Sequence, residues 1–341
     1  AMFGSSVQLG VAVAGIYSCY LLYSIVQEKI ATKAYDGERF QFTLFLLLVQ
    51  CSLSVASSGV VMAFLRKGQP ASGFQKFSAH PKTRGVPFLE YARVSFFYIS
   101  AMLCSNTALY YISYPNQVPT AINQMFDFPQ VIIKSCKLVP VMAMNVLWRG
   151  KRYPVGDYLR VLAITLGVLV FTFQQNHTAS TSSMPLLGLG LGILSLLLDG
   201  VVGPSQDKIA EEHLASELQM MFFTNLWATV LCAIAALLKG EVLAAIAFLV
   251  RHPEGVRDIA LFSVTSAAGQ FFIFYTVRHF SALVLVTITT TRKFFTVLAS
   301  VLVGADGSGH ALTTAQWLAV VLVFCGLGWD QIAKLGRRHD G

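Results

Sequence analysis

Apolar residues occur along this chain in long runs separated by short polar segments. A helix needs about 20 predominantly apolar residues to cross the hydrocarbon core of a membrane. Because the connections between the runs are mostly short, we expect consecutive helices to run antiparallel in an all-α, polytopic membrane protein. The pattern predicts ten transmembrane helices, over residues 8–27, 42–65, 94–113, 129–148, 158–175, 185–203, 219–238, 258–277, 281–303 and 315–333.

The composition supports this fold class and excludes an ordinary soluble domain. Of the 341 residues, 55% are hydrophobic and 12% are charged, and the mean hydropathy is +0.61. About 25% of residues are charged in an average soluble protein. We therefore expect a single transmembrane domain over residues 1–341, in which the longest polar stretch, 66–93, forms an exposed loop.

The N-terminal segment and the cysteines predict no additional feature. No basic residue precedes the first apolar run and no cleavage site follows it, so we expect no secretory signal peptide. The six cysteines all lie in apolar segments and form no C-x-x-C pair, which predicts neither a disulfide framework nor a metal site. The sequence contains no Walker A loop and no H-E-x-x-H signature. We expect neither a cofactor nor an enzymatic activity.

Lysine and arginine are distributed unequally between the two ends of the predicted helices. With the N-terminus in the cytosol, fifteen Lys and Arg residues fall in cytosolic segments and six on the opposite side. Because cytosolic loops of membrane proteins carry the excess of basic residues, we expect both termini in the cytosol. The net charge of +8 is then mainly a topology signal, and we expect no nucleic acid partner. A glycosylation sequon at 176–178 falls on the non-cytosolic side in this orientation.

Four basic residues remain, and all of them lie inside predicted spans. Lys134 and Lys137 are three residues apart in the fourth span, so they share one helix face. Arg292 and Lys293 lie near the middle of the ninth span. Each charge at such a position costs about 2.5–3.5 kcal/mol on insertion scales. A cost of this size indicates that the four cations serve a function.

The ten spans divide into two sets of five, over roughly residues 8–175 and 185–333, which makes the fourth and ninth spans equivalent. The stretch KLVPVMAMNVL (137–147) also resembles KFFTVLASVLV (293–303). Because five is an odd number, the second set is expected to be inverted. Inverted repeats with a central site are typical of secondary transporters. We therefore expect a drug/metabolite transporter-like fold in which the four cations line one cavity.

Such a group of cations predicts a polyanionic ligand, because Arg offers a bidentate fork for phosphate and Lys a point charge. The alternative is that the cations pair with acids inside the membrane, among them Asp199. For Asp199 we favour another interpretation, a cap for a broken helix end before Gly200, Gly203 and Pro204. Gln270, in the eighth span, is suited either to bind a base or ribose or to hydrogen-bond a neighbouring helix.

Several segments resemble the nucleotide-sugar transporter family, solute carrier family 35, B subfamily, in order along nearly the whole chain. The combination of KSCK with TTTRKFF is most similar to the endoplasmic reticulum branch, variously described as a UDP-galactose transporter homologue and as an ATP/ADP exchanger. The segments are QEKI (27–30), SNTAL (105–109), KSCKLVPVM (134–142), LDG…SQD (198–207), NLW (225–227), SAAGQFFIF (266–274) and TTTRKFFTVLAS (289–300).

This resemblance implies antiport of nucleotides or nucleotide sugars, either ATP/ADP or UDP-galactose/UDP-glucose, across the endoplasmic reticulum or Golgi membrane. It also implies that Glu28 occupies the family's acidic position, where it can pair with a site cation; an interfacial loop charge is the alternative. The residues that we expect to bind substrate are Lys134, Lys137, Arg292, Lys293, Glu28 and Gln270.

Two further points qualify the resemblance. About fifteen residues around 114–128 depart from the family pattern and are expected to form a longer loop or an alternative start to the fourth span. A non-transporting membrane scaffold or assembly protein is the rival class of function, although a scaffold has no use for four cations inside the membrane.

Overall fold

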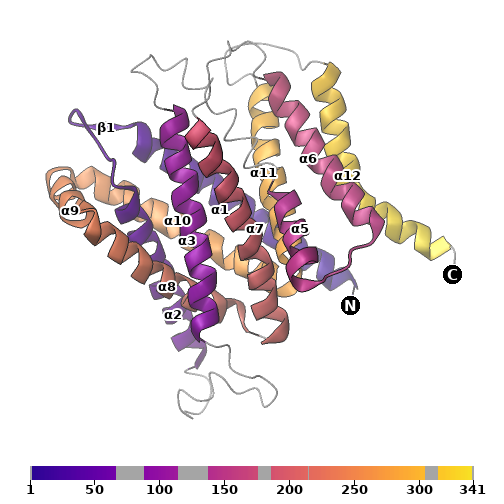
Figure 1. Cartoon of the computed structure of the whole chain (residues 1–341), viewed down its shortest axis with the longest axis horizontal. Helices are drawn as coiled ribbons and strands as arrows, with labels where there is room; N and C mark the ends of the chain where they lie inside the picture. The colour runs from indigo at the N-terminus through magenta and orange to yellow at the C-terminus, as the bar shows by residue number, and fades with distance from the viewer. Residues whose placement is uncertain are drawn as a thin grey trace. The chain divides into compact units, whose positions relative to one another are not determined.

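The computed structural model describes residues 2–66, 88–113, 137–175, 186–213, 215–303 and 314–339. Within these ranges the chain is almost entirely helical (Figure 1). Two short strands, β1 (Ala34–Tyr35) and β2 (Glu38–Arg39), pair antiparallel. The helices are α1 (Met2–Thr32), α2 (Thr43–Arg66), α3 (Phe88–Ser113), α5 (Leu138–Arg149), α6 (Val155–Gln175), α7 (Leu186–Glu212), α8 (Glu217–Leu238), α9 (Glu241–Arg251), α10 (Pro253–His279), α11 (Ala282–Val303) and α12 (Thr314–His339).

Each predicted span overlaps one of these helices, and only α9 has no counterpart among the predictions. The fourth span is described from Lys137 onward, so its predicted beginning lies outside the described residues. In the described part of the chain, four helices are long and apolar enough to cross a membrane: Val7–Gln27, Thr43–Leu65, Glu217–Leu238 and Pro253–His279.

Local sequence explains where several helices begin and end. Ser216 and Gln219 form a capping box at the start of α8, in which the side chain of each accepts a hydrogen bond from the backbone N–H of the other. Pro253 occupies the first turn of α10, where its missing N–H costs no helical hydrogen bond. Gly150 ends α5 with a φ of 62°, a left-handed conformation that glycine adopts without strain.

Three connections differ from the prediction. Residues 88–93, assigned to an exposed loop, form the first turns of α3, while 67–87 lie outside the described residues. The connection after α1 contains the hairpin β1–β2, whose turn residues Asp36 and Gly37 have φ values of 48° and 89°. Positive φ at both positions is typical of a type I′ hairpin turn. The connection after α8 contains α9.

The chain forms two compact units. Unit 1 comprises Ala1–Ile99 and Ser205–Ile288, and unit 2 comprises Ser100–Pro204 and Thr289–Gly341. In unit 1, α1 packs on α10, and α2 packs on α8 and α10. In unit 2, α6 packs along α12, and α5 packs on α6.

Aromatic and aliphatic side chains fill a core at one end of unit 1, where the hairpin meets α1, α9 and α10. The ring of Tyr35 contacts that of Phe248 edge to face, with centroids 5.7 Å apart. Tyr23 stacks on Phe262 with centroids 4.5 Å apart. The buried members of this core are Val26, Ile30, Tyr35, Phe40, Phe248, Ile259 and Phe262.

The interpretation of Asp199 as a cap for a broken helix end is wrong. Helix α7 continues from Leu186 to Glu212 with Pro204 inside it, so Asp199 lies in the middle of a helix. Proline removes one helical hydrogen bond and crowds the preceding turn. Gly200, four residues earlier, makes room for a neighbour instead, because a Cβ there would lie 3.0 Å from Pro140 Cβ.

Candidate functional site

Lys137 and Asp199 form an ion pair in unit 2. Lys137 Nζ lies 3.0 Å from Asp199 Oδ2, and the two side chains are 33% and 26% exposed. Lys137 occupies the position before α5, with helical backbone angles, and Asp199 reaches it from the middle of α7. For Lys137, the structure thus contains the ion pair with an acid that the alternative interpretation of the cations predicted. Because both side chains keep some exposure, Lys137 is accessible to an anion.

The other predicted cations are described to different extents. Arg292 lies half-buried on α11, in unit 2, next to the buried Thr290 and Thr291. Lys293 follows it on the same helix, but its side chain lies outside the described residues, as does Lys134 altogether. The structure therefore places Lys137 and Arg292 in the same unit, and a joint site of all four cations stays a prediction.

Gln270 lies buried on α10 in unit 1 and takes part in a contact between helices. Its Oε1 accepts a hydrogen bond from Asn225 Nδ2 on α8, at 2.7 Å. Asn225 Nδ2 also donates to the carbonyl of Met221, at 2.8 Å. Of the two alternatives for Gln270, the hydrogen bond to a neighbouring helix is present, and binding of a base or ribose stays a prediction. Asn225 lies in the NLW segment, but no spacing in the sequence pointed to this partner.

Glu28 belongs to α1, but its side chain lies outside the described residues. Its neighbour Lys29 donates a hydrogen bond to Asp258 Oδ1 at 2.7 Å, and Tyr35 Oη donates to the other oxygen of the same carboxylate at 3.0 Å. Asp258 is 6% exposed, so these two partners satisfy a buried charge at the start of α10. Burial, together with this hydrogen bond, raises the pKa of Tyr35 to about 12. The Tyr35 hydroxyl therefore remains a donor through the neutral range.

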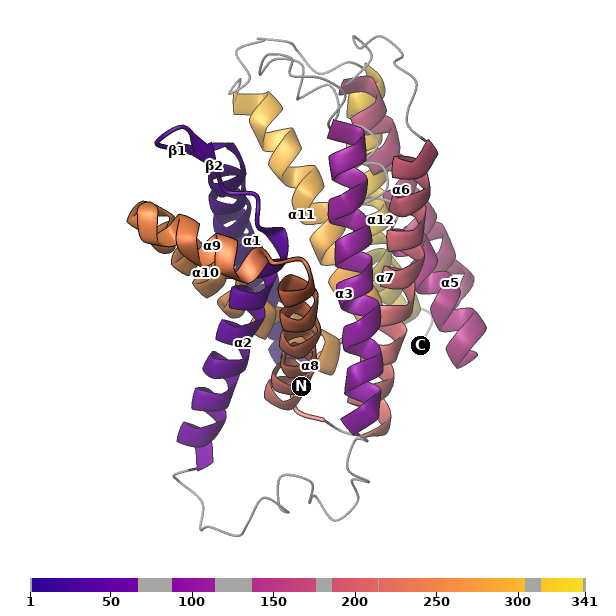
Figure 2. The same ribbon diagram turned by 60° about the vertical axis from the view of Figure 1, so that its left-hand side comes forward.

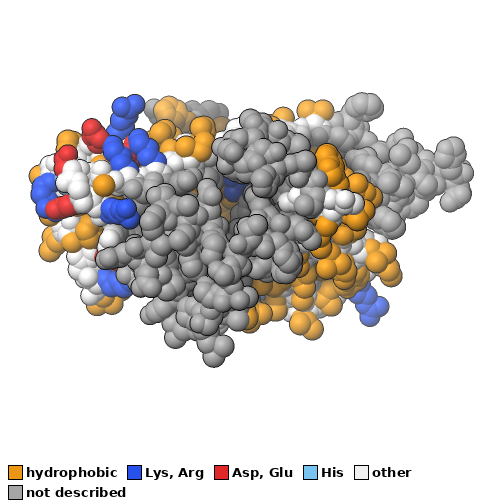
Figure 3. All heavy atoms as spheres, turned by 90° about the horizontal axis from the view of Figure 1, so that it is seen from above, with side chains coloured by type: hydrophobic (Ala, Val, Ile, Leu, Met, Phe, Trp, Pro, Cys, Tyr) orange, Lys and Arg blue, Asp and Glu red, His pale blue; other side chains and the backbone are white. Residues whose placement is uncertain are grey.

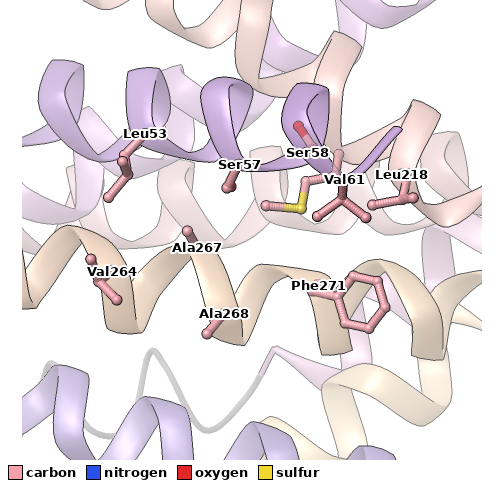
Figure 4. A pocket seen from close by; sticks show the side chains of 10 residues that line it. Leu53, Ser57, Ser58, Val61, Leu218, Val264, Ala267, Ala268 and Phe271 are labelled. Atoms are coloured by element: carbon pink, nitrogen blue, oxygen red, sulfur yellow. The ribbon is translucent and has the colours of Figure 1, made fainter. Parts of the chain in front are cut away.

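A groove of about 330 Å³ lies in unit 1 between α2, α8 and α10 (Figure 4). Ser57 and Ser58 both donate to the carbonyl of Ser54 in their own helix, at 3.1 and 2.6 Å. The described residues around the groove include no charged side chain, so it offers no charged partner for a phosphate. They are Leu53, Ser57, Ser58, Val61, Leu218, Met221, Val264, Ala267, Ala268 and Phe271.

Membrane-length helices and charged side chains within apolar segments define a multi-pass membrane protein of the transporter class. The chain belongs to the UAA transporter family, whose pattern matches residues 8–333. This assignment confirms the resemblance to the nucleotide-sugar transporters.

Relatives with the name solute carrier family 35 member B1 match nearly the whole chain. The protein from Danio rerio is 37% identical over 337 residues, covering 97% of this chain and 93% of its own. The protein from Gallus gallus is 38% identical, covering 97% and 93%, and that from Dictyostelium discoideum is 36% identical, covering 96% and 78%.

A protein of known crystal structure is similar in fold. It is 15% identical to this chain, with a TM-score of 0.50 over 97% of this chain and 99% of its own. At this level of identity the likeness concerns the fold alone.

Proposed function

We propose that the protein is a secondary antiporter that exchanges nucleotides or nucleotide sugars by alternating access across the endoplasmic reticulum or Golgi membrane. The observation that carries this proposal is the ion pair of Lys137 with Asp199 beside an apolar helix of unit 2. Arg292 lies in the same unit. The names of the relatives are consistent with transport of a solute. The proposal that this solute is a nucleotide rests on the chemistry of the cations.

The ion pair supports a binding role because it gives Lys137 a partner when no substrate is present. A charge in apolar surroundings is costly without a partner, and the two side chains of this pair are only partly exposed, at 33% and 26%. A phosphate bound near Lys137 competes with Asp199 for the ammonium group. Substrate binding and release then exchange one anionic partner for another, which keeps the charge satisfied in both states.

Packing within the units supports an inverted five-plus-five repeat. In chain order, α2 and α8 correspond to the second and seventh spans, and α6 and α12 to the fifth and tenth. Each helix of these two pairs packs on its own equivalent, as a two-fold relation between the repeats permits. A second contact also occurs in both repeats. In unit 1, α1 (the first span) packs on α10 (the eighth). In unit 2, the corresponding helices are α7 (the sixth) and α3 (the third), and Ser195 of α7 donates to the carbonyl of Ala101 in α3 at 2.8 Å.

The four cations that we expect in the site would bind phosphate groups, which ATP, ADP and UDP-sugars share. ATP carries more negative charge than a UDP-sugar, so four cations favour ATP/ADP exchange. Strict counter-exchange follows from electrostatics, because an empty site leaves several like charges close together inside the membrane and hinders return of the unloaded carrier. Asp199 relieves this repulsion for Lys137 only in part.

Uptake into proteoliposomes tests the proposal. Labelled ATP, ADP, UDP-galactose and UDP-glucose are supplied at equal concentrations to vesicles that are empty or preloaded with unlabelled nucleotide. We expect uptake only into preloaded vesicles, with ATP and ADP taken up fastest. Equal uptake into empty vesicles would contradict exchange, and uptake of UDP-sugars alone would contradict the preference for adenine nucleotides. A scaffold would transport none of the four and would gain no thermal stability from any of them.

A further inference from the structure

Helix α9 (Glu241–Arg251) connects two helices that are long and apolar enough to cross a membrane. Helix α8 ends at Leu238 and α10 begins at Pro253, so α9 has only a few residues of connection on either side. Figure 2 shows α9 running crosswise to α2, on which it also packs. At 1.5 Å per residue, its eleven residues extend about 16 Å, roughly half the thickness of the hydrocarbon core. The helix therefore cannot cross the membrane, and its connections keep it at the membrane boundary.

The inner face of α9 is fixed to unit 1. Ala245 and Phe248, three residues apart, are buried. Phe248 packs edge to face against Phe40, with ring centroids 5.6 Å apart, and against Tyr35 of the hairpin. At the beginning of the helix, Glu241 Oε2 accepts a hydrogen bond from the backbone N–H of Leu44 at 2.9 Å. These contacts fix which side of α9 faces outward.

The outward side of α9 is apolar. Leu243, Ile246 and Val250 follow one another at intervals of three and four residues, so they form one stripe. Their side chains are 77%, 47% and 78% exposed. No charged residue occurs in the sequence between Glu241 and Arg251. A helix that faced water would instead carry polar residues on this side.

Charged groups lie at the ends of α9 and on the hairpin beside it. Arg251 Nη1 lies 3.0 Å from Glu38 Oε1 of β2, and His252 Nδ1 lies 3.2 Å from Asp36 Oδ2. Lys239, at the other end, is mostly exposed. Figure 3 shows Lys, Arg, Asp and Glu side chains gathered over the end of unit 1 that carries β1 and α9. Unit 1 thus presents a polar hairpin and an apolar helix side by side.

We propose that α9 lies in the membrane interface, with Leu243, Ile246 and Val250 inserted among phospholipid acyl chains and the hairpin directed toward water. Helices of this kind bind a bilayer through an apolar face buried about 5–10 Å into the boundary between headgroups and acyl chains. The bilayer is the occupant that the connections favour, because α9 joins two membrane-crossing helices on the same side. In the predicted orientation that side is the non-cytosolic one.

Photolabelling of the whole protein in phosphatidylcholine vesicles tests this assignment. The probe is a phosphatidylcholine that carries a diazirine on its acyl chain, and the labelled residues are identified by mass spectrometry. We expect label on Leu243, Ile246 and Val250 at a level similar to that on Val60 and Phe64 of α2, which are exposed within a membrane-crossing helix. We expect hydroxyl radicals generated in the water to modify the hairpin and to spare α9.

A variant and its matched control separate insertion from a general effect on labelling. Val250→Gln should lower the acyl-chain label on α9 several-fold, because a polar side chain is driven from the acyl region. Val170→Gln, at an exposed valine of α6 in unit 2, should leave the label on α9 unchanged. Two results would overturn the proposal: modification of the three α9 residues by hydroxyl radicals without acyl label, or their protection from both reagents with cross-links to a second copy. Neither readout depends on transport, so the outcome is separate from that of the proposed function.

Discussion

Two interfaces each join a helix to its counterpart in the other predicted repeat. They are α2–α8 in unit 1 and α6–α12 in unit 2, and their packing differs. In α6, a Cβ added to Gly167 would lie 2.6 Å from Val323 Cγ2 and 2.9 Å from the carbonyl oxygen of Ala319. In α2, a Cβ added to Gly59 would lie 3.4 Å from the ring of Phe222, an ordinary contact. The backbones of α6 and α12 therefore approach each other through glycine, as small residues permit in membranes.

The α2–α8 interface relies on other side chains. Cys51 and Cys232, both buried, place their thiols within hydrogen-bond distance of each other. The apolar groove opens beside this interface. The two interfaces thus differ in how closely the helices approach, and of the two glycines Gly167 is the one that has no room for an added methyl group.

The largest expected effect is a difference in transport between variants of two lysines that each form an ion pair with an aspartate, Lys137 in unit 2 and Lys29 in unit 1. Lys137→Ala should abolish nucleotide exchange, because Lys137 is expected to bind phosphate. Its effect on thermal stability should be small, because the Asp199 side chain that loses its partner is 26% exposed. Lys29→Ala should leave measurable exchange. Initial rates in preloaded proteoliposomes, at matched protein content, measure the difference.

Two companion variants sharpen this test. Arg292→Lys should also lose much activity, since a point charge does not replace a bidentate fork. Asp199→Asn should retain binding of nucleotide, because it removes the competitor of the phosphate. Normal exchange by both Lys137→Ala and Arg292→Ala would refute the phosphate site.

The next effect concerns the two glycines. Gly167→Ala should lower the free energy of unfolding by about 2 kcal/mol, because overpacking at a close helix contact typically costs 1–3 kcal/mol. Gly59→Ala makes the same change in α2 and should be neutral or stabilising by up to about 1 kcal/mol, the difference in helix propensity. Thermal unfolding in detergent compares the two, and equal losses would contradict the difference in packing.

The contacts of Asp258 give a smaller effect. Tyr35→Phe removes one hydrogen bond to the buried carboxylate and should cost about 1–2 kcal/mol of stability. Because the pKa of Tyr35 is raised to about 12 from an ordinary value of 10, its contribution is complete below pH 10 and disappears as the pH rises through 12. The difference in stability between wild type and variant should therefore be constant from pH 6 to 9. A difference that vanished at neutral pH would exclude the hydrogen bond as its cause.

The smallest effect is the coupling between Asn225 and Gln270 across α8 and α10. Hydrogen bonds between membrane helices contribute about 0.6 kcal/mol on average in double-mutant cycles. Asn225→Ala, Gln270→Ala and the double variant should show a coupling of this size in thermal unfolding. If Gln270 also binds the nucleotide, Gln270→Ala raises the substrate concentration needed for half-maximal exchange, whereas Asn225→Ala changes stability alone.

The helices were predictable because a long apolar run within a bilayer has to satisfy its own backbone hydrogen bonds, which it does as a helix. Helix α9 was missed because eleven residues are too few to cross the membrane, although nine successive apolar residues (242–250) were visible. The hairpin was missed although Asp36-Gly37 is a strong turn signal.

The partners of charged and polar residues were harder to predict than the helices. The ion pair of Lys137 with Asp199 and the hydrogen bond of Asn225 with Gln270 join residues that are far apart in the sequence. No local pattern specifies such pairs, because they depend on which helices are neighbours. The role of Asp199 was predicted wrongly because Pro204 and the nearby glycines resemble a helix end, whereas α7 continues through them to Glu212.

The boundaries between the two units fall inside helices. Helix α3 passes from one unit to the other after Ile99, α7 after Pro204 and α11 after Ile288. Each of these three helices therefore contributes residues to both units. In α7 the boundary coincides with Pro204, which has no N–H and therefore removes one helical hydrogen bond. At this point the chain passes from one unit to the other through a helix that has one backbone hydrogen bond fewer than a regular helix.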